Sequence, residues 1–158
     1  MRIAVIYESY FGNTEQAAEA IGEVLKRFGE TEVKRAAVVR PDQLKGWDLI
    51  VFGSPTRKFT AAPSVKTLIR RMPRGSLTGV RTAVFDTRID VSKVSSGFLK
   101  RLISIFGYGA EKIQTLLASR GAVSVSPPQW FYVSGTQGPL SEGELDRASA
   151  WAQTLVSS

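Results

Sequence analysis

The chain has 158 residues and is 43% hydrophobic, which is enough for one well-filled core and too little for two ordinary domains. It contains no cysteine and no histidine, which excludes disulfides, thiol chemistry, soft metal sites and imidazole catalysis, so an enzyme built on it would depend on a bound group. The formal charge is +7. No basic-then-apolar signal precedes the first apolar run, and no run approaches the roughly 18 residues of a membrane span. We therefore expect one cytoplasmic domain covering residues 1–158.

The positive charge is concentrated in the middle of the chain. Residues 57–120 carry 13 basic and 3 acidic side chains, whereas residues 1–56 carry 7 and 8, and residues 121–158 carry 1 and 3. A basic excess of this kind raises the question of nucleic acid. The basic segment, however, lacks the interleaved aromatic side chains that stack on bases, so we expect no nucleic-acid partner.

Apolar runs typical of strands alternate along the chain with amphipathic patterns typical of helices. The predicted strands cover residues 3–7, 32–39 (near a sheet edge), 49–52 and 80–85, and a last strand has two halves, 122–125 and 130–133, separated by Pro127 and Pro128. Four helices are predicted. The first follows the turn at 9–14, the second begins at Pro63, the third begins near Ala110, and the last follows a capping box formed by Ser141 and Glu144. Residues 98–106 predict a short amphipathic insert. This alternation predicts an α/β fold, a doubly wound parallel sheet of five strands with helices on both faces.

The turn at residues 9–14 joins the first strand to the first helix. It places backbone N–H groups at the positive end of a helix, and Ser9, Asn13 and Thr14 add side-chain donors, which suits a phosphate. A simple helix cap by Asn13 or Thr14 explains the same stretch equally well.

Two further segments, 54–59 and 86–90, also follow apolar strands. In a doubly wound sheet the carboxyl ends of the strands meet at one crevice. We therefore expect all three segments to converge on one ligand.

Four motifs, in this order and context, resemble the flavodoxin family. They are Ser-Tyr-Phe-Gly-Asn-Thr after the first strand, Gly-Ser-Pro-Thr after the third, Phe-Asp-Thr-Arg after the fourth and Gly-Pro-Leu-Ser-Glu-Gly-Glu-Leu before the last helix. The resemblance covers essentially the whole chain. It implies the sheet order 2-1-3-4-5 and bound flavin mononucleotide (FMN), with no catalytic side chain and no metal ion of its own.

The resemblance also implies which residues contact FMN. The phosphate loop would be Ser9, Tyr10, Phe11, Gly12, Asn13 and Thr14; the first loop beside the isoalloxazine ring would be Ser54, Pro55, Thr56, Arg57, Lys58 and Phe59; and the second loop would begin with Thr87, Arg88 and Ile89. Flavodoxins usually pack aromatic rings on both faces of the flavin. Phe59 is the candidate for one face and Tyr108 for the other, although Tyr108 could equally be a partly buried residue beneath the insert.

Two other folds of similar pattern are disfavoured. A nicotinamide-binding Rossmann domain should show G-x-G-x-x-G in the first turn, which here has one glycine. A receiver-type signalling domain needs clustered carboxylates after the first strand to hold magnesium, and Glu8 stands alone there.

Two departures from the family pattern bear on the flavin. Arg57, Lys58 and Arg88 flank the expected ring site, which is typically acidic in the family, and their positive field predicts a less negative potential for forming the anionic reduced flavin. In addition, no glycine occurs from Ser54 through Arg74. The peptide flip that many flavodoxins make in the first loop should therefore cost about 1 kcal/mol more at Arg57-Lys58.

The function that the resemblance favours is electron transfer between a reductase and an acceptor, with acidic redox partner proteins drawn to the basic segment. The alternative is an FMN-dependent oxidoreductase acting directly on a small substrate such as a quinone or a porphyrinogen, with residues 88–109 forming part of its site. A binding module without a redox role is a third, weaker hypothesis.

Overall fold

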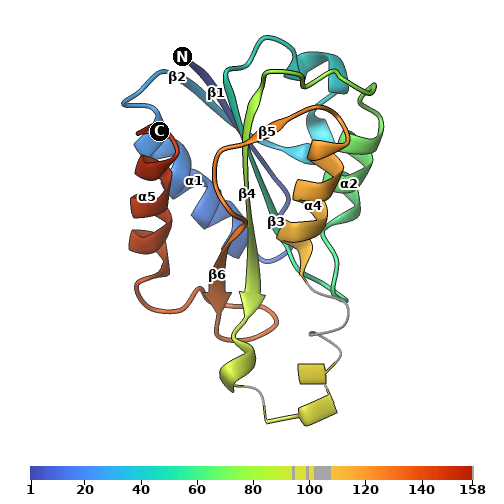
Figure 1. Ribbon diagram of the computed structural model, residues 1–158. Helices are drawn as coiled ribbons and strands as arrows, with labels where there is room; N and C mark the ends of the chain where they lie inside the picture. Colours follow the sequence, from blue (N-terminus) through green and yellow to red (C-terminus); the bar gives the residue numbers. More distant parts are fainter. Residues whose placement is uncertain (94, 99, 102–107, 158) are drawn as a thin grey trace.

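The computed structural model describes residues 1–93, 95–98, 100–101 and 108–157. A parallel sheet forms its centre (Figure 1). The strands are β1 (Arg2–Tyr7), β2 (Glu30–Arg35), β3 (Leu49–Pro55), β4 (Arg81–Ile89), β5 (Val123–Ser124) and β6 (Gln129–Val133). The named α-helices are α1 (Asn13–Leu25), α2 (Pro63–Arg70), α4 (Gly109–Ala118) and α5 (Glu144–Thr154), and 3₁₀ turns cover Ala36–Val38, Pro41–Leu44 and Val91–Lys93.

The strand order is β2-β1-β3-β4-β5, all neighbours are parallel, and β6 also pairs with β4. This confirms the predicted doubly wound sheet and its 2-1-3-4-5 order. The sixth strand arises because the last strand is divided, as the sequence predicted. β5 pairs with residues 81–82 of β4, β6 pairs with residues 85–89, and Pro127 and Pro128 lie between the two halves.

Helices α1 and α5 cover one face of the sheet, and α2 and α4 cover the other (Figure 1). The continuous apolar character of the central strands follows from this arrangement, because both faces of each strand are covered. In β1, Ile3 and Val5 belong to the core under α1 and α5, whereas Ala4 and Ile6 belong to the core under α2 and α4. Burying each large apolar side chain contributes about 1.5–3 kcal/mol, so the two cores together fix the layers.

Some predicted boundaries are wrong. The strand expected at 32–39 ends at Arg35, after which the chain turns into a 3₁₀ helix, and β4 continues past Phe85 to Ile89 because β6 pairs with this extension. The predicted capping box is absent: α5 begins at Glu144 behind Gly143, and the Glu144 carboxylate instead accepts the N–H of Tyr132 in β6. Of the predicted insert, residues 99 and 102–106 lie outside the described residues.

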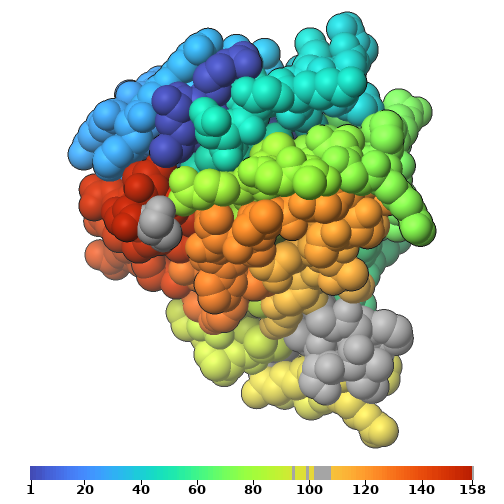
Figure 2. All heavy atoms as spheres, turned by 45° about the horizontal axis from the view of Figure 1, so that its top comes forward, coloured from blue at the N-terminus to red at the C-terminus, as the bar shows by residue number. Residues whose placement is uncertain are grey.

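Both chain termini lie at one end of the molecule, and the segment after β4 lies at the other (Figure 1). The yellow residues of this segment project from the body in Figure 2. Phe98 within it is 74% exposed. Within the described ranges, no helix is both long enough and apolar enough to cross a membrane.

Candidate functional site

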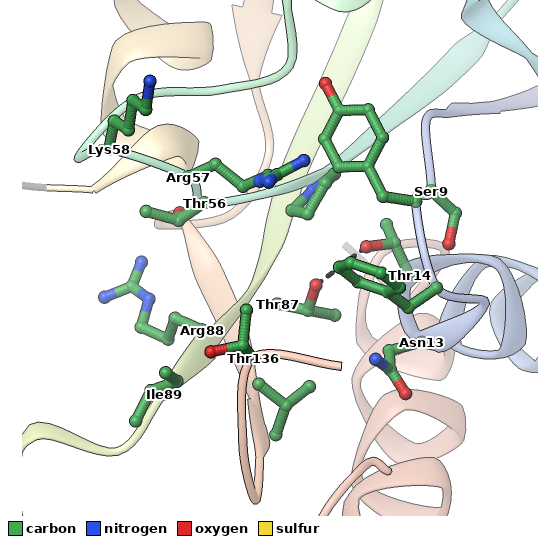
Figure 3. Close-up of a pocket in the computed structure, with 14 residues that line it drawn as sticks. Ser9, Asn13, Thr14, Thr56, Arg57, Lys58, Thr87, Arg88, Ile89 and Thr136 are labelled. Carbon is green, nitrogen blue, oxygen red and sulfur yellow. Dashed lines mark hydrogen bonds between the residues drawn. The ribbon is translucent and has the colours of Figure 1, made fainter. Parts of the chain in front are cut away.

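A pocket of about 250 Å³ opens at the carboxyl ends of β1, β3 and β4 (Figure 3). This is the edge at which a doubly wound sheet binds its ligands. The pocket brings together the three segments that the sequence placed at strand ends. Every residue predicted for the site lines it except four, which are Gly12, Ser54, Phe59 and Tyr108.

The loop between β1 and α1 is shaped by one glycine and one serine. Gly12 is the N-terminal cap of α1 with a φ of 91°, a conformation that favours glycine, and its N–H donates to Ser9 Oγ over 3.0 Å. The N–H of Gln16 makes a bond to the carbonyl of Gly12. The N–H groups of Asn13 and Thr14 come before this first α-helical hydrogen bond, so they have no acceptor within the helix. They lie at the positive end of the helix dipole.

Two of the predicted side-chain donors also connect the walls of the pocket. The buried hydroxyls of Thr14 and Thr87 lie 2.7 Å apart and join α1 to β4 (Figure 3). Asn13 Nδ2 donates to the carbonyl of Gln137, in the loop after β6. A Cβ on Gly138 would lie 2.3 Å from Asn13 Oδ1, so the close approach of this loop requires glycine.

Hydrogen bonds of Ser54 and Thr56 fix the loop after β3. Ser54 is fully buried, and its hydroxyl accepts the N–H of Ala62 over 2.7 Å and donates to the carbonyl of Pro55. Thr56 Oγ1 accepts the N–H of Gly109 at the start of α4. Ser54 is thus placed to shape the loop rather than to line the pocket.

The tip of the same loop is a tight two-residue turn. Arg57 and Thr60 exchange two backbone hydrogen bonds of 3.0 Å, and the residues between them, Lys58 and Phe59, have φ angles of 48° and 63°. Such turns usually contain asparagine or glycine because both central residues need positive φ. The absence of glycine does not keep this loop out of the left-handed region, and the backbone carries the strain instead.

The side chain of Arg57, in the loop after β3, reaches the loop between β1 and α1. Its guanidinium carbon lies 4.8 Å from the ring centre of Tyr10 and 5.9 Å from that of Phe11, both of which are more than 40% exposed. Figure 3 shows Arg57 extending toward the loop that carries Ser9, with Lys58 at the outer edge. A cation over an aromatic face is attracted by the ring, so this contact joins the two loops that the sequence assigned to opposite ends of the flavin.

Arg88 is not the free cation that the sequence suggested. It is 6% exposed, and its guanidinium binds both carboxylate oxygens of Asp86. The same group lies 3.5 Å from the ring centre of Tyr108 and 4.8 Å from that of Trp130. Because Asp86 balances this charge, the expected positive field at the pocket comes from Arg57 and Lys58.

The two candidate aromatic residues do not line the pocket. Tyr108 packs against Arg88, and its hydroxyl is buried without a hydrogen-bond partner among the described residues. Burial raises the pKa of this tyrosine. Phe59 is half-buried at the tip of the loop, and its carbonyl accepts a hydrogen bond from Lys112. Among the described residues, the aromatic side chains that line the pocket are Tyr10 and Phe11.

Sequence reasoning missed Val133 and Thr136, which line the pocket from the end of β6 and the loop after it. The rule that ligands lie beyond the carboxyl ends of strands would have found them. The predicted site includes the segments after the first, third and fourth strands and leaves out the segment after the last. The divided last strand concealed that β6 ends beside β4.

The family of the chain follows from comparison with known proteins. A family model described as flavodoxin matches residues 5–151. The chain belongs to the flavodoxin family. It is 28% identical over 158 residues to a flavodoxin from Clostridium saccharobutylicum, covering 99% of this chain and 96% of that protein. It is also 28% identical over 139 residues to an NAD(P)H dehydrogenase (quinone) from Archaeoglobus fulgidus, covering 68% of this chain and 73% of the other.

Solved flavodoxin structures share the fold. Oxidised flavodoxin 1 from Bacillus cereus superposes with a TM-score of 0.75 at 19% identity, covering 99% of this chain and 98% of that one. Flavodoxin 2 from the same organism gives a TM-score of 0.73 at 21% identity over 99% of each chain. These likenesses cover the whole sheet and its helices.

Members of the flavodoxin family bind FMN, transfer electrons and work with redox partners, and so does this protein. The pocket has the chemistry that such a ligand requires. Helix N–H groups and neutral hydroxyls, which suit a phosphate, lie at the start of α1, and the lining also includes apolar and aromatic side chains together with Arg57 and Lys58.

Proposed function

We propose that this flavodoxin carries electrons between a reductase and an acceptor protein whose docking surfaces are acidic. The observation that carries the proposal is the charge at the mouth of the pocket. Arg57 and Lys58 are exposed there, and neither forms an ion pair with a carboxylate in the described ranges.

The positive charge continues onto the face formed by α2 and α4. Lys66 and Arg70 lie on α2, and Lys112 lies on α4; among the described residues these three cations have no acidic partner either. Burial lowers the pKa of Lys66, and the positive charges of Arg70 and Lys112 lower it further. An acidic partner would reduce the repulsion between these positive charges, which favours docking beside the pocket.

We assign FMN to the pocket with its phosphate at residues 9–14 and its ring beside residues 55–58 and 87–89. When bound, FMN supplies the electron-transfer chemistry. The N–H groups at the start of α1 hold the phosphate, and the Thr14 and Thr87 hydroxyls keep that helix at a fixed position on the sheet. Arg57 and Lys58 place positive charge at the pocket, which favours acceptance of negative charge there.

The test is the salt and charge dependence of electron transfer. The FMN-loaded protein would be reduced by an NADPH-dependent flavodoxin reductase in a stopped-flow instrument. We expect the bimolecular rate to fall with ionic strength, and K58E and R70E each to slow it by about tenfold at low salt. R27E, which reverses an exposed charge at the far end of α1, is the matched control. Equal rates for K58E, R70E and R27E would contradict the docking face.

A second function is favoured by the similarity to the quinone dehydrogenase from Archaeoglobus fulgidus. In that case the protein would reduce a small quinone directly. Turnover of benzoquinone with NADPH by the FMN-loaded protein alone, at a rate that a reductase does not increase, would support this function over the carrier. No turnover without a reductase would support the carrier.

A further inference from the structure

We propose that Arg35 is a positioning residue for the FMN phosphate, acting by neutralising two carboxylates beside the phosphate loop and by anchoring the loop. The inference rests on FMN binding and not on the proposed carrier function. Arg35 is the last residue of β2 and does not line the pocket.

Two carboxylates flank residues 9–14. Glu8 is 9% exposed and directly precedes the loop; its Oε1 accepts the N–H of Ser9 over 2.9 Å, and its Oε2 accepts the hydroxyl of Ser64 from α2. Glu15 lies in the first turn of α1, and its Oε1 accepts the hydroxyl of Tyr7 over 2.8 Å. Both acids are therefore fixed at the edge of the anion site.

These acids work against a phosphate. The positive potential at the N-terminus of a helix stabilises a carboxylate there as it would stabilise a bound phosphate, so the two compete for it. The carboxylate and the phosphate are also both negative and repel each other at close range. The flavin phosphate approaches a double negative charge near neutral pH, so the repulsion would be larger than for a single charge. Because the loop has no lysine of its own, the charge of Glu8 and Glu15 has to be balanced by a cation from another element.

Arg35 supplies that counter-charge with one guanidinium. Its Nη1 lies 2.8 Å from Glu8 Oε1 and 3.0 Å from the carbonyl oxygen of Ser9, and its Nη2 lies 3.2 Å from Glu15 Oε2. The group also lies 5.4 Å from the ring centre of Tyr7. It thus contacts both acids and the backbone of the loop at once.

The sheet sets this geometry. β1 and β2 are parallel neighbours, and the register places Arg35 opposite Tyr7, the last residue before Glu8. The planar fork of arginine donates in several directions from one rigid group, whereas a lysine is a single point charge. Arg35 is therefore suited to this bridging position in a way that lysine is not.

The test compares FMN with riboflavin, which lacks the phosphate. The apoprotein would be titrated with each flavin by fluorescence quenching, using R35Q, R35K and the triple variant R35Q/E8Q/E15Q. We expect R35Q to weaken FMN binding by about tenfold and riboflavin binding by less than threefold. The triple variant should recover FMN affinity to within about threefold of the starting protein. R35K should bind FMN with an affinity between those of R35Q and the starting protein. R40Q, which changes an exposed arginine paired with Asp42, is the control and should change neither affinity.

Equal losses of FMN and riboflavin affinity in R35Q, or no recovery in the triple variant, would overturn the proposal, because either result means a general structural role. If R35Q fails to fold, E8Q/E15Q decides the question. With Arg35 retained and the acids neutral, FMN should bind more tightly while riboflavin affinity stays unchanged. Weaker or unaltered FMN binding in that variant would also overturn the proposal.

Discussion

Arg88 donates hydrogen bonds of 2.6 Å to both carboxylate oxygens of Asp86, two residues earlier on the same face of β4. Asp86 also accepts the N–H of Ala110 in the first turn of α4. Burial raises the pKa of Asp86, and the bonds from Arg88 and Ala110 act against that shift by stabilising the charged carboxylate. The pair thus ties the end of β4 to the start of α4, next to the pocket.

D86N should strongly destabilise the fold. The substitution removes the bidentate partner of the buried Arg88 guanidinium and leaves it the half-exposed Glu111 carboxylate 3.6 Å away, and breaking a buried pair in this way typically costs about 3–5 kcal/mol. Urea unfolding of the apoprotein measures the change. D42N, which removes the carboxylate from the exposed Arg40 pair, is the control and should leave the midpoint unchanged. A loss below about 1 kcal/mol in D86N would show that the pair is not needed for stability.

R57Q should make the reduction potential of the bound flavin more negative, by an amount on the order of tens of millivolts. The reason is that Arg57 lines the pocket without a carboxylate partner among the described residues, whereas Arg88 is balanced by Asp86. Potentiometric titration of the FMN-loaded protein measures the shift. R57K keeps the charge and should keep the potential, and R27Q lies far from the pocket and should also have no effect. An unchanged potential in R57Q would mean that solvent screens this charge.

K58G should stabilise the protein by about 0.5–1 kcal/mol. Lys58 has a φ of 48°, which costs a residue with a Cβ about 1 kcal/mol and costs glycine little. Thermal or urea unfolding of the apoprotein measures the change. The matched control is K45G, because Lys45 has an extended backbone with a φ of −78°, so glycine there should only destabilise. The same sign for both substitutions would argue against strain in the loop.

Glu144 should make stability depend on pH in the acidic range. Burial disfavours its charge, but the hydrogen bonds from Arg147 and from the Tyr132 N–H outweigh burial and lower its pKa below the ordinary value of 4.5. A carboxylate whose pKa is lower in the folded state stabilises that state above the ordinary pKa, and the contribution is lost as the pH falls through the lowered value.

E144Q should therefore unfold at lower urea concentration at pH 7, with a loss of about 1–2 kcal/mol. The difference from the unmodified protein should shrink as the pH falls from about 5 to 3, because the carboxylate is then protonated in both folded and unfolded chains. Urea unfolding at several pH values measures both effects. E142Q changes an exposed neighbour and serves as the control. A difference that stays constant with pH would assign the loss to packing rather than to charge.

Much of the fold was readable from local pattern. Continuous apolar runs such as residues 49–52 are typical of strands covered on both faces, and Pro127-Pro128 marked the break in the last strand. The errors occurred where partners decide an element's limits. β4 extends to Ile89 because β6 pairs with it, and Glu144 turns from its expected capping role to the N–H of Tyr132.

The chain's own sequence determined the strand and helix order, the glycine-containing turn at residues 9–14 and the positive charge of the middle segment, because these depend on near neighbours and composition. Only the tertiary structure decided which charges act at the pocket. Arg57 and Arg88 look alike in the sequence, yet one lies exposed over Tyr10 and the other is buried against Asp86. No pattern in the sequence marks Arg35 as part of the site. Its contacts with Glu8 and Glu15 exist because β1 and β2 pair in one register. Charge becomes a property of a site only when folding sets the distances between charged groups.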